Sequence, residues 1–221
     1  VLYNPFLWNL LNVKYVIAKG LIAEGLQPVF QSKEMDNEDQ QEEQGKPPKR
    51  VLVAENPNML PRTFFVKGAK KESQIDILNH LKNGDFKPRE LAFIETDLPV
   101  KLDTVSPGDT AYVVSHKDEY IKIEANAKGN NLLFISEIYY PASWFAFIDN
   151  KETPIYKTDF AFRSIIVPPG KHEIELKFIS KGFEKGKSIS LVSNIIVLIA
   201  FAGGIFLEIK GRKKRSNKSE A

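Results

Sequence analysis

Residues 135–178 read ISEIYYPASWFAFIDNKETPIYKTDFAFRSIIVPPGKHEIELKF. Short runs rich in β-branched and aromatic residues are separated here by turn signals, among them Asp149-Asn150 and Pro168-Pro169-Gly170. This combination is typical of consecutive antiparallel strands joined by tight turns. The stretch therefore predicts β structure.

The same pattern extends toward the N-terminus as far as residue 111 and gives seven predicted strands. Seven short strands with tight turns favour an antiparallel β-sandwich or jelly roll, with its core within residues 110–180. The predicted strands cover residues 111–115, 120–127, 132–140, 144–148, 151–156, 160–167 and 171–179.

The preceding part of the chain adds strands and one or two short helices. Residues 6–13 predict a short helix that runs into a strand at 14–18, and further strands are expected at 26–31, 50–54 and 63–66. Apolar residues at near-helical spacing predict a helix from Lys71 to Lys82, which ends at Asn83-Gly84. The fold class is therefore mainly β.

An acidic and polar segment interrupts this pattern at residues 32–49. It contains almost no apolar residue, so it cannot offset the entropy lost on ordering, and it predicts a disordered loop. Its carboxylates lack the spaced ligands and the turn glycine of a calcium loop, so no metal site is predicted there.

A membrane-spanning helix is predicted near the C-terminus. Twenty residues from Ser188 to Leu207 carry no charge and reach roughly 30 Å as a helix, the thickness of the hydrocarbon core. A buried helix of a soluble protein is the alternative, but it would show a polar stripe. We assign residues 188–209 to this helix, and its Gly203-Gly204 and other small residues indicate neighbouring upstream helices as partners.

A basic tail, residues 210–221, gives the expected sidedness. The whole chain has a net charge of +3. The tail contributes +5 through its six Lys and Arg residues and Glu220, so residues 1–209 carry a net charge of −2. This distribution argues against nucleic-acid binding, and it places the tail in the cytoplasm and residues 1–187 outside the inner membrane of a bacterium. The residues that fix this topology are Lys210, Arg212, Lys213, Lys214 and Arg215.

The N-terminus has neither an initiator Met nor the basic region and cleavage site of a signal peptide. The chain is therefore expected to be cut from a longer protein.

The chain contains none of the common catalytic motifs. His80, His116 and His172 stand singly, and no nucleophile elbow, phosphate-binding loop or zinc-binding helix is present. Carboxylate pairs such as Asp149 with Asp159 would serve a stand-alone hydrolase only across a cleft, and exposed strand-end charges are the simpler interpretation. No catalytic residue, metal ligand or cofactor is predicted.

An aromatic cluster around a proline turn, residues 137–147, is the most distinctive constellation. Tyr139, Tyr140 and Trp144 are its candidate ligand-binding residues, because aromatic faces stack on sugar rings or lie at a membrane interface. Packing in the core of the sandwich is the competing interpretation.

Three motifs together resemble a known family. LWNLLNVKYVIA at residues 7–18, ENPNMLPRTFFV at 55–66 and the stretch 135–178 resemble the C-terminal part of YfhO-type bacterial membrane proteins, over most of residues 6–209. Ala142-Ser143 stands where the family often has a glycine before the Trp. The resemblance implies a large protein with many spanning helices, similar to GT-C glycosyltransferases that use polyprenyl-phosphate sugars, whose acidic catalytic residues lie in N-terminal loops outside this chain.

Two functions remain open from the sequence. The first is an outward-facing accessory domain of an envelope glycosyltransferase, in contact with a glycan, a polyprenyl-linked sugar or the catalytic loops. The alternative is a non-enzymatic, membrane-anchored binding or scaffold module.

Overall fold

The computed structural model describes residues 4–19, 24–32 and 51–219. The chain divides into two units, Val1–Phe178 and Ile179–Ala221. The first unit is built of three sheets and two short helices, and the second is one long helix. The predicted fold class, mainly β with short helices and a C-terminal apolar helix, is confirmed. The segment predicted as disordered, 32–49, lies outside the described residues except for Ser32.

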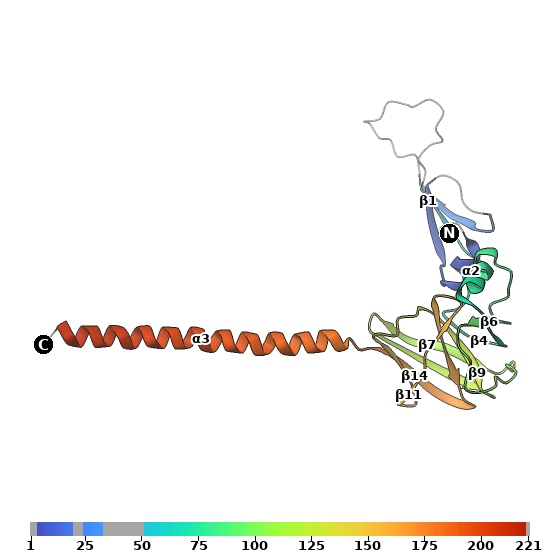
Figure 1. The fold of residues 1–221 in the computed structure, drawn as a ribbon. Coiled ribbons are helices and arrows are strands. Elements are labelled where there is room, and N and C mark those ends of the chain that lie inside the picture. Colours follow the sequence, from blue (N-terminus) through green and yellow to red (C-terminus); the bar gives the residue numbers. More distant parts are fainter. Residues whose placement is uncertain (1–3, 20–23, 33–50, 220–221) are drawn as a thin grey trace, which may run out of the picture. The chain divides into compact units, whose positions relative to one another are not determined.

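One face of the sandwich is a five-stranded antiparallel sheet in the order β11-β10-β14-β8-β7. Figure 1 labels three strands of this sheet, β7, β11 and β14. Its strands are β7 (Thr110–Lys117), β8 (Tyr120–Ala127), β10 (Trp144–Ile148), β11 (Lys151–Thr153) and β14 (Gly170–Phe178).

The facing sheet has six strands in the order β4-β9-β13-β12-β6-β5, and β5 and β6 form its one parallel pair among the described residues. Three of these strands come from before residue 110. The strands are β4 (Thr63–Val66), β5 (Ala69–Lys71), β6 (Ala92–Ile94), β9 (Asn131–Ile138), β12 (Tyr156–Thr158) and β13 (Phe162–Val167).

The sandwich core lies between these two sheets. β8 alternates buried and half-buried residues because only one of its faces is covered. In β9, by contrast, the first six residues are all buried, because its sheet is covered on both faces. The side chains that meet between the sheets include Ile123, Ile135, Ile165, Ile174 and Leu176, none of them exposed.

Two helices cover the outer face of the six-stranded sheet. Helix α1 (Pro5–Leu10) buries Leu10, and α2 (Gln74–Asn83) buries Ile77 and Leu81 against phenylalanines of β4, β9 and β13. Ser73 caps the start of α2 by accepting a hydrogen bond from Asp76 N–H, and Gly84 ends it in the left-handed conformation with φ 64°.

A smaller antiparallel sheet precedes the sandwich, in the order β1-β3-β2. Its strands are β1 (Tyr15–Lys19), β2 (Gln27–Gln31) and β3 (Val51–Glu55). Asn56, which follows β3, is buried; its side-chain amide lies 2.9 Å from the Asn9 amide and donates a hydrogen bond to the Val13 carbonyl. The small sheet is thereby tied to α1.

Among the predicted elements whose bounds differ from the structure, two have a clear physical cause. The helix predicted from Lys71 begins at Gln74, because Ser73 is its cap and residues up to Lys71 pair with β6 as β5. The strand predicted at 151–156 is two strands in different sheets, β11 and β12. Pro154 lies between them and cannot donate a hydrogen bond to a sheet.

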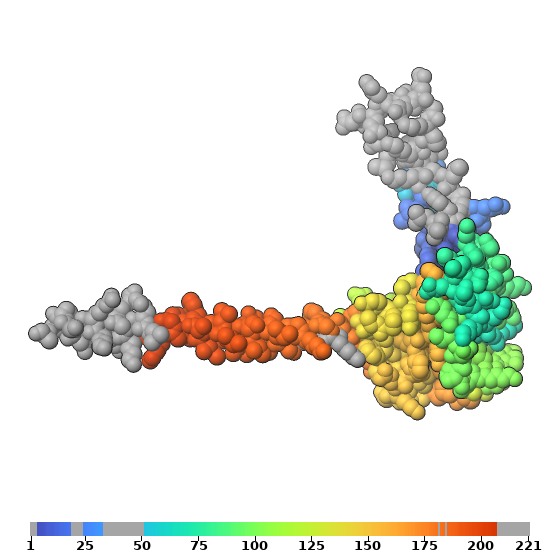
Figure 2. Space-filling view, viewed as in Figure 1, coloured from blue at the N-terminus to red at the C-terminus, as the bar shows by residue number. Residues whose placement is uncertain are grey.

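The second unit is the helix α3 (Lys181–Ser219). Residues Lys185–Phe206 form a candidate membrane span of 22 residues with mean hydropathy 2.3 and no buried residue. Figure 2 draws this helix, coloured orange to red, as one continuous rod of side chains. The side chains of the topology residues Lys210, Arg212, Lys213, Lys214 and Arg215 lie outside the described part of the structure.

Candidate ligand-binding pocket

The three predicted aromatic residues lie around the connection between β9 and β10, in different surroundings. Tyr140 is 53% exposed, whereas Tyr139 and Trp144 are half-buried. The Arg163 guanidinium lies 4.3 Å from the centre of the Trp144 ring, and the Phe178 ring meets that ring edge-on at 5.6 Å. Trp144 therefore packs within the protein, and Tyr140 is the most accessible of the three.

Arg163 is a buried cation beside this cluster, with 3% of its surface exposed. Its Nε donates to the Ile138 carbonyl oxygen at 2.7 Å, and its Nη1 has no hydrogen-bond partner among the described residues. Burial lowers the pKa of Arg163 to about 10, and Glu137 opposes this shift. The guanidinium therefore remains charged at pH 7 and stabilises Trp144 through a cation–π contact.

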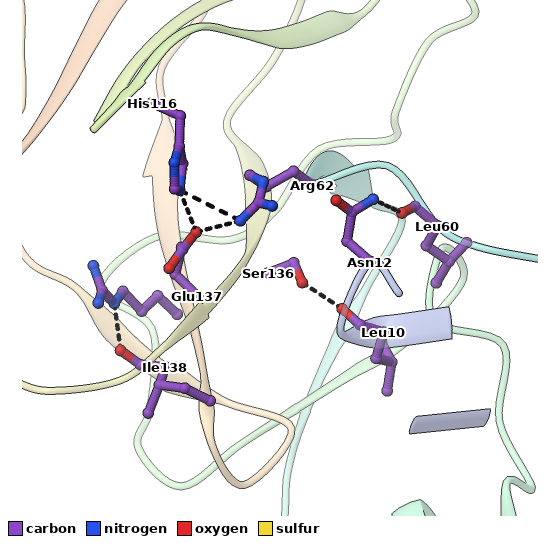
Figure 3. A network of polar contacts seen from close by, with 9 residues as sticks. Leu10, Asn12, Leu60, Arg62, His116, Ser136, Glu137 and Ile138 are labelled. Atoms are coloured by element: carbon purple, nitrogen blue, oxygen red, sulfur yellow. Dashed lines mark hydrogen bonds and ion pairs between the residues drawn. The ribbon is translucent and has the colours of Figure 1, made fainter. Parts of the chain in front are cut away.

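A second polar cluster joins β9 to neighbouring segments. Glu137 Oε1 accepts from Arg62 Nη1 at 2.6 Å and lies 2.8 Å from His116 Nε2. Figure 3 shows Glu137 between these two side chains, and Ser136 next to it bound to the Leu10 carbonyl of α1. His116 thus has a carboxylate partner. No group of three His, Asp or Glu residues in the described part of the chain is placed to hold a metal ion.

A pocket of about 760 Å³ lies between α1, α2 and the β12–β13 loop. Most of its lining is apolar, which suits an apolar ligand. We name it the Asp159 pocket after the acid in its lining; the apolar side chains around it include Leu7, Leu11, Leu78, Leu81, Ile138 and Phe162.

Asp159 is fully buried in this lining. Its Oδ1 accepts from Phe93 N–H at 2.7 Å, while its Oδ2 has no partner among the described residues. Burial raises the pKa of Asp159 to about 7, although the bond from Phe93 opposes the shift. Near neutral pH this carboxyl group therefore accepts or donates a hydrogen bond according to its protonation state.

The loop that carries Asp159 is strained. Asp159 and Phe160 have φ values of 44° and 70°, and the Ala161 N–H donates to the Asp159 carbonyl at 2.9 Å, so the chain forms a γ-turn centred on Phe160. A bulky residue with positive φ costs on the order of 1–3 kcal/mol. The Phe160 side chain is half-buried in the pocket lining, so the strained residue belongs to the candidate site.

Residues 107–190 match the model of a family described as bacterial membrane protein YfhO. This segment is similar to the YfhO family. The resemblance predicted from the sequence is confirmed over these residues, which include the motif at 135–178; the motifs at 7–18 and 55–66 lie outside the match. Neither the comparison with curated proteins nor that with solved structures gives a match.

The matched segment supplies one wall of the Asp159 pocket, with Ile138 and residues 159–162, while α1 and α2 lie outside the matched residues. The expectation that Asp159 is an exposed strand-end charge was wrong. Asp149, its suggested partner, is exposed and accepts instead from Glu173 N–H at 3.0 Å and lies 2.6 Å from His172 Nδ1. A lone acid directly before the apolar run Phe160 to Phe162 was the signal available in the sequence.

Proposed function

We propose that residues 1–187 are an outward-facing accessory domain, residues 188–209 the last spanning helix and residues 210–221 a cytoplasmic tail of a polytopic membrane protein in the bacterial inner membrane. The observation that carries this proposal is the fully exposed apolar helix Lys185–Phe206, which follows β14 closely in the chain. The Lys/Arg-rich tail supports the sidedness, because such flanks stay in the cytoplasm.

Single cysteines are expected to show this topology directly, because the chain has no cysteine of its own. In intact cells a membrane-impermeant maleimide should label Ala142→Cys, which replaces an exposed residue, and should label Ser216→Cys only after permeabilisation. Ile135→Cys, at a fully buried position, is the control for folding and should stay unlabelled in both conditions. Labelling of the tail in intact cells would reverse the proposed orientation.

The activity we propose for the whole protein is transfer of sugars from a polyprenyl-phosphate carrier, with this domain as an accessory. The support is the family resemblance together with an accessible tyrosine, Tyr140, on the aromatic connection. In this proposal the Tyr140 ring stacks on the acceptor glycan, while Trp144 holds the connection in place through Arg163 and Phe178.

Tyr140→Ala is expected to reduce sugar transfer by the intact protein roughly 2- to 10-fold, since an aromatic contact is worth about 0.5–1.5 kcal/mol. The measurement is transfer of a labelled sugar at limiting acceptor. Tyr112→Ala is the matched control, because Tyr112 is 55% exposed but lies on the edge strand β7. Equal activity of both variants and the parent would remove the contact role of Tyr140.

The second candidate function is a non-enzymatic, membrane-anchored binding module. The Asp159 pocket favours it, because an apolar cavity with one unpaired buried carboxyl oxygen suits an apolar ligand that carries a hydrogen-bond donor. The same transfer assay separates the two candidates. A binding module predicts no sugar transfer even by the unchanged intact protein.

A further inference from the structure

One end of the sandwich gathers apolar and aromatic side chains. We call it the exit end and define it by Ile138, Tyr139, Tyr140, Trp144 and Phe178. Ile138 and Tyr140 are 55% and 53% exposed, and the other three are half-buried. Trp144 pairs with Phe178 in register, so the start of β10 and the end of β14 lie side by side at this end.

The exit end is also where the chain leaves the domain for the candidate span. Ile179 and Ser180 separate β14 from α3, and the span begins at Lys185. The three steps from Phe178 to Lys181 in extended conformation and the four helical steps from Lys181 to Lys185 together cover at most roughly 16 Å. The headgroup region adds roughly 5 to 8 Å on each side of the hydrocarbon core. A link as short as that from Phe178 to Lys185 therefore keeps the exit end close to the headgroup region.

The side chains at the exit end have the chemistry of a membrane interface. Tyr and Trp are enriched there, because their rings contact the acyl boundary while their polar edges stay hydrated. Tyr140 is an exposed aromatic residue with a polar hydroxyl group, and Ile138 adds an exposed aliphatic side chain two residues away. A single exposed apolar residue needs no explanation, but a cluster from which the chain continues after a short link into a candidate span does.

We propose that the exit end rests in the outer headgroup interface of the lipid bilayer, with Tyr140 and Ile138 as its lipid contacts. This inference rests on the proposed membrane insertion of α3. It gives the β-domain a fixed height above the membrane, because two attachments, the span and the exit end, restrict its motion more than a single tether does. This lipid contact and the glycan stacking proposed above for Tyr140 exclude each other, and the quenching experiment decides between them.

Depth-dependent fluorescence quenching tests this contact. The chain has two tryptophans, Trp8 and Trp144, and both are replaced by Phe to give a silent background. Single tryptophans are then introduced as Tyr140→Trp at the exit end, Lys128→Trp at the opposite end of the sheet and Ile196→Trp in the span. The full chain is reconstituted in phosphatidylcholine vesicles whose acyl chains are brominated near the headgroup or near the bilayer centre.

The Tyr140→Trp reporter is expected to lose about half of its fluorescence with bromine near the headgroup and less with deep bromine, as an interfacial indole should. The Lys128→Trp reporter should be unaffected, and Ile196→Trp should be quenched most by deep bromine. Quenching of Ile196→Trp without quenching of Tyr140→Trp would overturn the exit-end contact and leave the span intact. An unquenched Ile196→Trp would instead overturn the span itself. The Trp8→Phe chain, which retains Trp144, repeats the measurement without altering the exit end.

Discussion

Phe134→Ala is expected to lower the free energy of unfolding of the β-domain by about 3–5 kcal/mol, the range for removing a buried phenylalanine. Phe134 is not exposed at all. Its ring stacks on Phe64 at 4.8 Å and meets Phe162 at 5.2 Å, so truncation opens a cavity between three adjacent strands. β9 is buried on both faces, which leaves little room for relaxation.

Denaturant unfolding followed by intrinsic fluorescence measures this loss, because both tryptophans lie in the first unit and α3 has none. Phe30→Ala is the matched control. Phe30 is 58% exposed on β2, so the same truncation there should change the unfolding free energy by about 0.5 kcal/mol or less. A loss at Phe134 no larger than at Phe30 would contradict the double-sided packing of β9.

Much of the sandwich was predictable because its strands are short, alternating and separated by turns. The bounds predicted for β8 and β10, 120–127 and 144–148, are those of the structure. The Asp149-Asn150 turn is also evident in the sequence, since both residues take positive φ between β10 and β11. Local patterns specify these elements, so no tertiary information was needed.

The strands that the sequence did not predict depend on distant partners. β5 and β6 have three residues each and pair in parallel across the intervening helix α2. A run of three residues carries too little periodicity to distinguish a strand from a loop. Only the six-stranded sheet, to which they add an edge, gives them their conformation.

The candidate site was predictable in composition but not in geometry. Residues 137–147 were identified as an aromatic cluster, yet the cover over Trp144 comes from Arg163 on β13. Asp159 was treated as an exposed charge, although it is buried through its bond with Phe93, which lies 66 residues away. Contacts of that sequence separation decide burial, and single-sequence patterns do not contain them.

Asp159→Asn is expected to raise the free energy of unfolding above pH 7 and to change it little at pH 4. Asn is isosteric, stays neutral, and retains an oxygen that can accept the Phe93 N–H bond. The folded-state pKa of Asp159, raised by burial to about 7, lies above the ordinary value of 3.8 for this side chain. Between those values the folded state holds the proton that the unfolded state has lost, so the stability of the parent falls as pH rises from about 4 to 7.

The gap between the two pKa values lowers the unfolding free energy of the parent at pH 8 by on the order of 4 kcal/mol. The neutral amide of the Asp159→Asn variant avoids this loss. Unfolding free energies of both chains at pH 4, 6 and 8 measure it. Asp149→Asn is the control of opposite sign. The hydrogen bond with His172 lowers the pKa of Asp149, so the ionised carboxylate stabilises the parent above pH 4. The variant lacks this carboxylate and should be less stable than the parent there. Parallel pH profiles for Asp159→Asn and the parent would mean that the pocket does not hold this carboxyl group neutral.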